Sequence, residues 1–411
     1  MTRPSSSLAE KRVVATEARS PLSAPESSLA PLRVLHLNSL LTGGGTDDQC
    51  VKLAAGLHAL GQKVWLAGPA GREFEPVIKN FGVPFLDTGA ESGKLQFILH
   101  AARMIRRERI QIVHSHHGRD IWPVIFAVRL AGTKPKLVLT RHLAKSPSSW
   151  ASRRFLLGQC DALIAVSDFV AKVLRDGVYE PDSPEAERRV RPPLQGDHGK
   201  IRVIYGGIDT AKFKPANADQ LRGELGLGSG DFAFAVVGGF DLPRGKGQRE
   251  FLAAAARIHQ DAPNARFLII GRGNMEEILK ADIQRLGLTG KAWLTGQKRD
   301  MPQIMNAIDC LVHPQIGTEA LGLVVCEAHA CGKPVIASAL DGIPEAFAPG
   351  GCGKLVPAED VGSLAEAMLE QTKRAAPESD QRAAMHERVE QFFSLQRQAE
   401  KVLELYRELL C

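Results

Sequence analysis

Short apolar runs alternate along this chain with longer segments whose apolar positions recur every three to four residues. The first run, 32–37, leads into a glycine turn, and the run 64–68 follows the next periodic segment. That segment places the following residues on one helical face: Cys50, Leu53, Ala54, Leu57 and Leu60. A strand, a helix and a second strand form a βαβ unit, which predicts a parallel sheet.

The alternation continues to the end of the chain and restarts once. Apolar runs typical of strands occur in the first half at 110–115, 136–140, 162–166 and 201–204, and in the second half at 232–237, 267–271, 310–313 and 334–337. A turn at 205–209 separates the two series. We therefore predict an α/β protein with two doubly wound, Rossmann-like domains, 32–205 and 206–394, which face each other across a cleft at the carboxyl ends of their strands.

Three segments stand apart from this pattern. Residues 1–31 are rich in Ser, Ala, Pro and Arg without periodicity, so we expect a disordered tail. Residues 176–200 contain four prolines and many charges, and we interpret them as an exposed insertion. The amphipathic stretch 395–411 predicts a C-terminal helix that packs back across the domain interface.

Composition narrows the class of protein. Hydrophobic residues make up 44% and charged residues 24% of the chain, which supports a large core. No apolar run approaches the roughly 18 residues of a membrane span, and no secretory leader is evident. The seven cysteines are scattered without a C-x-x-C pair, which favours reduced thiols in a cytoplasmic protein over disulfides or a zinc site.

The net charge of +6 is distributed unevenly. Residues 32–200 contain 24 Lys/Arg and 16 Asp/Glu (+8), residues 201–411 contain 24 and 27 (−3), and 1–31 adds +1. A basic first half, with Arg103, Arg106, Arg107 and Arg109 close together, suggests an anionic membrane surface or a phosphorylated lipid; solvated helix faces are the alternative. Nucleic acid is disfavoured, because no aromatic residues interleave with the charges.

Two glycine-containing loops follow the first predicted strand of each domain. Gly44 and Gly45 at the turn after 32–37 allow backbone N–H groups to approach an anionic ligand, although a structural turn has the same appearance. In the second domain, Arg244 and Lys246 lie on a loop bounded by glycine, where their charges could neutralise a diphosphate. A solvated basic turn is the alternative for that loop.

The segment 317–327 is the most informative. Glu319 lies in a loop after the strand 310–313, and Glu327 lies on the helix that we expect to begin near Leu323, after Gly322. The free N–H groups near Leu323 and Val324 would meet phosphate oxygens. The two carboxylates would accept hydrogen bonds from sugar and ribose hydroxyls.

Histidines cluster after two predicted strands of the first domain. His114, His116 and His117 end one strand, and His142 follows the next, with Asp120 nearby. A metal site is one interpretation, but the ligand spacing is poor. We favour the wall of an acceptor pocket, where histidine can donate to a hydroxyl or a developing oxyanion.

Together these segments resemble the retaining glycosyltransferases of family 4, which have the GT-B fold. The resemblance extends from about residue 32 to the C-terminus. Glu319 and Glu327 are its most specific part, and 203–209, 236–240 with 246–247, 269–273 and 342–345 support it.

The resemblance implies roles for individual residues. Glu327 would hold the donor ribose, Glu319 the donor sugar and Lys246 the diphosphate. Gly44 and Gly45 would lie under the phosphate or sugar. His116 matches the family histidine near the reacting carbon, and no metal or other cofactor is expected.

The chain also departs from the family. Gly239 replaces the family arginine that pairs with the diphosphate, and we expect Arg244 to substitute for it.

The predicted activity is retaining transfer of a hexose from a nucleotide-diphosphate sugar to an acceptor hydroxyl, with the leaving diphosphate accepting the proton. The basic first domain and the family resemblance together suggest a lipid-linked or glycan acceptor in lipopolysaccharide or envelope synthesis. The protein would meet this acceptor at the inner face of the plasma membrane. A non-hydrolysing sugar-nucleotide epimerase and a degenerate, non-catalytic nucleotide-sugar-binding subunit are the alternatives.

Overall fold

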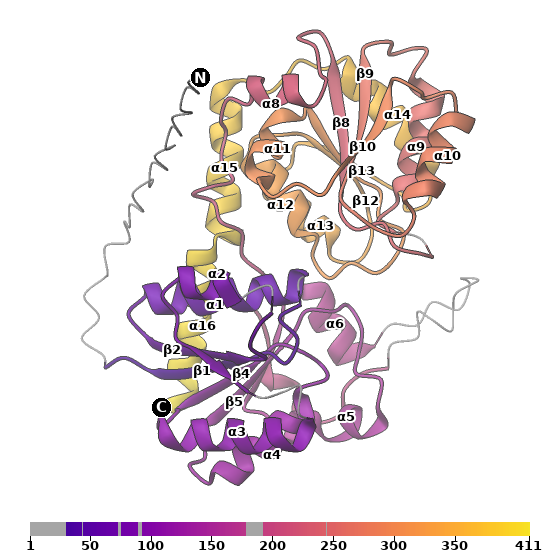
Figure 1. Cartoon of the computed structure of the whole chain (residues 1–411). Helices are drawn as coiled ribbons and strands as arrows, with labels where there is room; N and C mark the ends of the chain where they lie inside the picture. Colours follow the sequence, from indigo (N-terminus) through magenta and orange to yellow (C-terminus); the bar gives the residue numbers. More distant parts are fainter. Residues whose placement is uncertain (1–29, 43, 73–74, 89–92, 178–191, 244) are drawn as a thin grey trace, which may run out of the picture.

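The protein is described by a computed structural model that covers residues 30–42, 44–72, 75–88, 93–177, 192–243 and 245–411. Residues 1–29 of the predicted tail 1–31, residues 178–191 of the predicted insertion 176–200, and Arg244 lie outside the described residues. Each half of the chain forms a parallel sheet with helices on both faces (Figure 1), as a doubly wound domain requires.

The first sheet has the strand order β3-β2-β1-β4-β5-β6-β7. Its strands are β1 (Arg33–Leu37), β2 (Lys63–Gly68), β3 (Phe85–Asp87), β4 (Ile112–Ser115), β5 (Lys136–Arg141), β6 (Ala162–Ala165) and β7 (Ile201–Val203). Its helices are α1 (Gly45–Ala59), α2 (Glu75–Asn80), α3 (Lys94–Arg107), α4 (Ile121–Ala131), α5 (Trp150–Phe155) and α6 (Asp168–Asp176), with 3-10 turns at Leu156–Gly158 and His198–Lys200. The order reverses between β1 and β4.

The second sheet has the order β10-β9-β8-β11-β12-β13. Its strands are β8 (Phe232–Val237), β9 (Ala265–Ile270), β10 (Ala292–Gly296), β11 (Cys310–His313), β12 (Val335–Ser338) and β13 (Gly353–Val356). Its helices are α8 (Asp219–Glu224), α9 (Gln248–Ile258), α10 (Glu276–Arg285), α11 (Met301–Ala307), α12 (Leu323–Ala330), α13 (Ile343–Phe347), α14 (Val361–Thr372) and α15 (Ser379–Phe393). The order reverses between β8 and β11.

Both sheets are buried on both faces, which explains why their strands are continuous apolar runs. In the first domain, α3, α4 and α6 cover one face and α1 covers the other. In the second domain, α9, α10 and α14 cover one face, and α11, α12, α13 and α15 cover the other. The sequence analysis missed three edge or near-edge strands, β3, β10 and β13, because they are short or lack a long apolar run.

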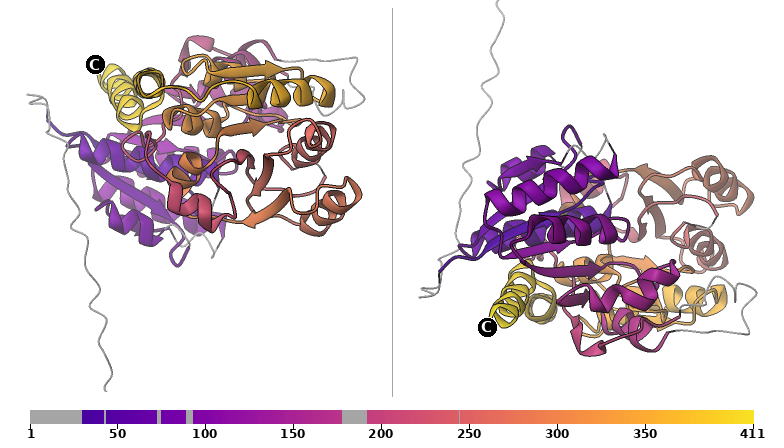
Figure 2. Two further views of the ribbon diagram at one scale, coloured as in Figure 1. Left: turned by 90° about the horizontal axis from the view of Figure 1, so that it is seen from above. Right: turned by 90° about the horizontal axis from the view of Figure 1, so that it is seen from below.

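The C-terminal helix α16 (Leu395–Leu410) joins the two domains. It continues from α15 of the second domain and packs against α1, with Ala399, Val402 and Tyr406 in the core of the first domain (Figure 2). Backbone bonds between Ile208 and residues 393–395 fasten the connection between the domains at the same place. The chain therefore crosses between the domains twice at one site.

Two further observations concern the whole chain. All seven cysteines are free thiols. Among the helices of the described residues, none is both long and apolar enough to cross a membrane.

Candidate active site

Lys246 and Glu319 come together at the point where the strand order of the second sheet reverses. Lys246 follows β8 and Glu319 follows β11, the two strands that flank the reversal. The Lys246 Nζ atom lies 2.8 Å from Oε2 of Glu319. In open α/β sheets, ligands bind outside the carboxyl ends of the strands at this reversal, so the pair lies where a ligand is expected.

A glycine makes this approach possible. Gly247 has a φ of +84°, and a Cβ atom there would lie 1.9 Å from the carbonyl oxygen of Pro314, just after β11. Any side chain would therefore push the loop with Lys246 away from Glu319.

Buried groups around Glu319 set its charge. Burial raises the pKa of Glu319, but the charge of Lys246 and its hydrogen bond to Glu319 oppose burial, and the pKa is lower than usual. His313 lies 3.9 Å from Glu319, and burial lowers its pKa to about 4. Glu319 is therefore ionised at neutral pH beside a cation and a neutral imidazole.

Two uncapped helix N-termini border this pair. Gly247 precedes α9, and Gly322, with a φ of +88°, precedes α12; no side chain of the described residues caps either helix. The first N–H groups of such helices favour anionic oxygens. Leu323 and Val324, at the start of α12, are half-buried. Glu327, one turn further along the helix, is half-buried too.

Glu327 faces the other domain. Burial raises its pKa to about 7, and the nearest charges that affect it belong to Lys52 and Asp48 on α1 of the first domain. Its carboxylate therefore lies near the interface between the domains. No contact between Glu327 and Lys246 is defined, so the predicted division of the donor between them stays a prediction.

Across the interface, α1 also begins after a glycine. Gly44 has a φ of +109° and precedes the helix, and no described side chain caps it. A Cβ atom on Gly44 or Gly45 would meet nothing within 4 Å, so the turn borders open space. Gly43 lies outside the described residues.

The histidines of the first domain form a buried chain. Nδ1 of His36 is hydrogen-bonded to Nε2 of His116 at 2.9 Å, and Nδ1 of His116 to Nε2 of His142 at 3.2 Å. Both nitrogens of His114 are bonded to hydroxyl groups, of Tyr406 on α16 and of Thr140, at 2.6 Å each. Burial lowers the pKa of each of these four histidines, to about 3 for His36 and His142.

This chain places His116 more deeply than the sequence analysis assumed. Its ring is 2% exposed and lies between two other imidazoles, whereas the half-buried His117 hydrogen-bonds Asp47. Nitrogen atoms of His36, His114 and His116 lie within 4.8 Å of one another, as metal ligands do. Five of the six ring nitrogens already have hydrogen-bond partners.

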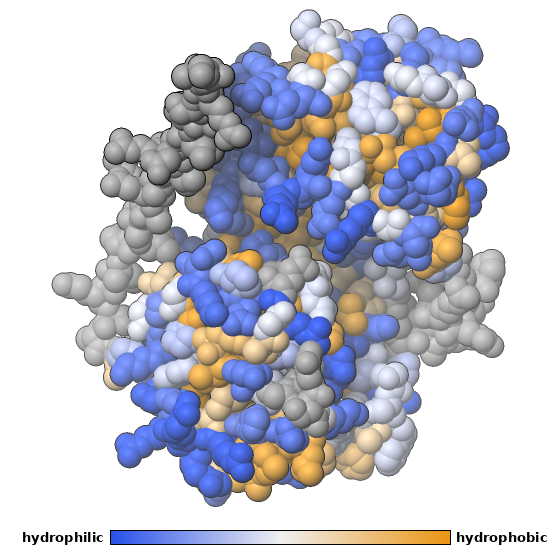
Figure 3. Space-filling view, in the orientation of Figure 1, coloured by the Kyte–Doolittle hydropathy of each residue, from blue (hydrophilic) through white to orange (hydrophobic). Residues whose placement is uncertain are grey.

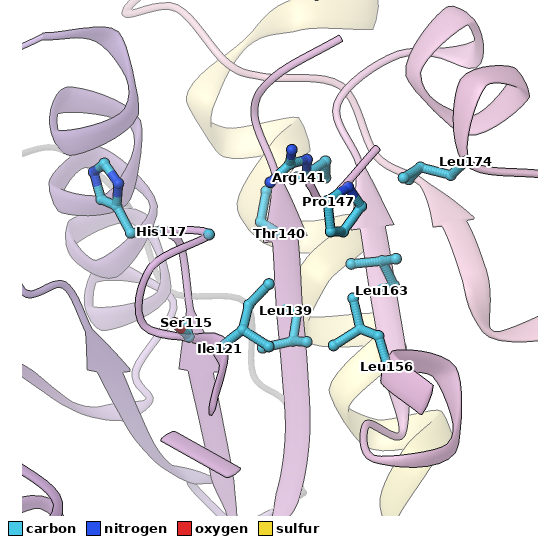
Figure 4. A pocket seen from close by; sticks show the side chains of 11 residues that line it. Ser115, His117, Ile121, Leu139, Thr140, Arg141, Pro147, Leu156, Leu163 and Leu174 are labelled. Carbon is cyan, nitrogen blue, oxygen red and sulfur yellow. The ribbon is translucent and has the colours of Figure 1, made fainter. Parts of the chain in front are cut away.

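A small pocket adjoins this cluster at the carboxyl ends of β4, β5 and β6. Figure 4 shows its apolar floor, formed by Leu139, Leu156 and Leu163, below Thr140 and Arg141. Arg141 is only 8% exposed.

Several residues of the site could not be predicted from the sequence. His36 was not recognised, because only the register of β1 with β4 pairs it with His114. Glu345 was noted only as part of a family motif, and it bridges the domains: its carboxylate accepts the backbone N–H groups of Asp168 and Phe169 on α6, at 2.8 and 2.7 Å. The Ser167 hydroxyl donates to the carbonyl of Ala320, next to Glu319.

Known proteins define the class. Residues 231–373 match the family of glycosyl transferases group 1, and residues 43–182 match Glycosyltransferase Family 4. Among solved structures, a glycosyltransferase from Rickettsia africae superposes with a TM-score of 0.78 at 21% identity, over 93% of this chain and 99% of that one. HepE from Anabaena, solved in complex with UDP, has a TM-score of 0.73 at 20% identity, over 92% and 100%. These likenesses confirm the GT-B fold.

The chain belongs to the family 4 glycosyltransferases. A D-inositol 3-phosphate glycosyltransferase from Mycobacterium marinum is 28% identical over 66% of this chain and 59% of its own length. A lipopolysaccharide core biosynthesis mannosyltransferase from Rhizobium meliloti is 25% identical over 89% and 94%. The matches thus span about three fifths of the inositol-phosphate enzymes and nearly all of the mannosyltransferase.

Proposed function

We propose that this protein transfers a sugar from a nucleotide-diphosphate donor to an acceptor hydroxyl. The observation that supports this most directly is the Lys246–Glu319 pair at the reversal of the second sheet, between the N-termini of α9 and α12. The site offers a cation and helix N–H groups for a diphosphate, with a carboxylate beside them for sugar hydroxyls.

In this proposal the second domain binds the donor. Lys246 and the N–H groups of Leu323 and Val324 hold the diphosphate, Glu319 holds the sugar, and Glu327 accepts the ribose hydroxyls. The open turn at Gly44 and Gly45 admits the phosphate or sugar from the first domain. Arg244, which we expected to replace the family arginine, lies outside the described residues and stays a prediction.

We further propose a retaining, front-face displacement without a metal or other cofactor. The bond between the anomeric carbon and the diphosphate breaks, the acceptor oxygen attacks from the same face, and the leaving phosphate takes the acceptor proton. Lys246 and the start of α12 stabilise the negative charge that develops on the diphosphate. His116 is neutral, and both of its ring nitrogens bond other imidazoles. In this proposal it therefore lies near the reacting carbon and positions His142 on the acceptor side.

For the acceptor we propose a lipid-linked or glycan precursor, as in lipopolysaccharide or envelope synthesis, met by a cytoplasmic protein at an anionic membrane surface. The related mannosyltransferase acts in lipopolysaccharide core biosynthesis by its name. Of the predicted arginines, Arg106 instead donates to the carbonyls of Leu130 and Ala131 at the end of α4. Trp150 and Phe155 on α5 are exposed and offer a better membrane contact. Apolar and polar residues interleave on the face of the molecule seen in Figure 3.

Incubation with UDP-, GDP- and ADP-sugars, with and without membranes, tests the proposal. Slow release of nucleotide diphosphate from one donor, accelerated by an acceptor in the membranes, is the expected result. Isomerised donor would favour the epimerase, and binding without turnover the degenerate subunit; either result would overturn the proposal.

A further inference from the structure

Arg141 is a buried cation at the carboxyl end of β5, directly before His142. It pairs in register with Ala165 of β6, so it is the last residue of an inner strand of the sheet. Its side chain is 8% exposed and lines the pocket of Figure 4, beside Thr140 and Pro147 and above the apolar floor. His117 is the histidine that lines this pocket.

No carboxylate in the described part of the chain pairs with this guanidinium. Its Nε–H donates to the carbonyl of Lys145 at 2.9 Å, which satisfies one of five donors. Arg222, whose side chain is half-buried, instead bonds the Asp309 carboxylate and two carbonyls. A buried charge without a counter-ion is strongly destabilising, so the position of Arg141 calls for an anion.

The surrounding chain supplies none. Residues 121–160 contain no Asp or Glu and seven Lys or Arg. Burial lowers the pKa of Arg141 to about 10, and no neighbouring carboxylate opposes that effect. The side chain is therefore still charged at neutral pH, in a region whose field attracts anions.

Local geometry leaves space for the guanidinium itself. A Cβ atom on Gly118 would lie 2.9 Å from Nη1 of Arg141, so glycine at this position lets the planar group lie against the backbone. A guanidinium edge matches the spacing of two oxygens of a phosphate or carboxylate. Because this segment has an excess of positive charge, a doubly charged phosphate should bind better than a singly charged carboxylate.

We propose that Arg141 binds a phosphate group of the acceptor. Arg141 then favours acceptors that carry a phosphate near the hydroxyl that is glycosylated. That the phosphate belongs to the acceptor rests on the proposed function. The anion site itself rests on the burial of Arg141 and on the lack of a carboxylate partner among the described residues.

The test uses the full chain and inorganic phosphate as the probe. The Nε–H resonance of Arg141, identified by its loss in Arg141→Lys, should shift saturably with phosphate in the wild type and in Lys246→Ala, which removes the donor-side cation. In Arg141→Met, the phosphate concentration that gives a set rise in Tm should be at least tenfold higher than in the wild type. Arg129→Met, in the same basic segment, should leave that concentration unchanged. A shift that does not saturate, or an unchanged Tm response in Arg141→Met, would overturn the site.

Stability without phosphate gives an independent readout. Arg141→Met removes an uncompensated buried charge, so the free protein should melt at the same or a higher temperature than the wild type. A purely structural role, through the bond to Lys145, predicts a lower Tm and contradicts the proposal. Phosphate binding at Arg141 without turnover of any donor would retain the anion site and refute the proposed function; turnover without phosphate binding would do the reverse.

Discussion

Lys246 pairs with Glu319 in the free protein, and in the proposed function the same side chain binds the donor diphosphate. Lys246→Ala should raise the Kd for the cognate nucleotide diphosphate at least tenfold, which corresponds to roughly 1.4 kcal/mol. Isothermal titration would measure it. The control is Lys354→Ala, which removes a lysine of β13 that pairs with Glu370 of α14. Equal affinities in the two variants would contradict the role of Lys246.

If Glu327 holds the donor ribose, as proposed, donor binding should depend on pH. Burial raises its pKa to about 7, and only the ionised carboxylate accepts both ribose hydroxyls. Affinity for the nucleotide diphosphate should therefore increase as pH rises from 6 to 8. Glu327→Gln should bind more weakly at pH 8 and lose this increase; a wild-type affinity independent of pH would show that Glu327 does not contact the ligand.

At the scale of elements, the contact between α13 and α6 connects the domains beside the site. Glu345→Ala leaves two N–H groups of α6 without their acceptor, at about 1–2 kcal/mol for this partly exposed contact. The two domains should separate more often, which small-angle X-ray scattering would detect as a larger radius of gyration.

Two matched variants refine this prediction. Glu345→Gln retains one acceptor oxygen and should show a smaller change. Glu366→Ala removes an exposed carboxylate of α14 and should leave the scattering unchanged. Identical profiles for Glu345→Ala and the wild type would mean that the contact does not hold the domains together.

At the scale of the whole molecule, buried neutral histidines couple folding to pH. The pKa values of His36 and His142 are lowered to about 3 and those of His313 and His329 to about 4, whereas unfolded histidines titrate near 6.5. Between these values only the unfolded chain binds the protons, so stability is full above pH 6.5 and falls as pH decreases. Each group contributes up to about 1.4 kcal/mol per pH unit.

Urea denaturation at pH 7, 6 and 5 would measure this dependence. His142→Gln should reduce the slope of unfolding free energy against pH, whatever it does to the stability itself. His58→Gln, on the exposed side of α1, should not change the slope. A stability that does not decrease between pH 7 and 5 would contradict neutral, buried rings.

The sequence by itself determined the two parallel sheets, the limits of α16 and the loops that contain Lys246 and Glu319. Buried parallel strands are continuous apolar runs, and glycine turns mark where each helix begins, so these features are written in local patterns. Family resemblance added residue roles that await their tests.

Only the tertiary structure decided which distant side chains meet. The pairing of His36 with His116, the bridge from Glu345 to α6 and the isolation of Arg141 depend on strand register and on packing between domains. A one-residue shift in register would direct each strand side chain to the opposite face of the sheet. Because such contacts join residues far apart in the chain, no local pattern specifies them.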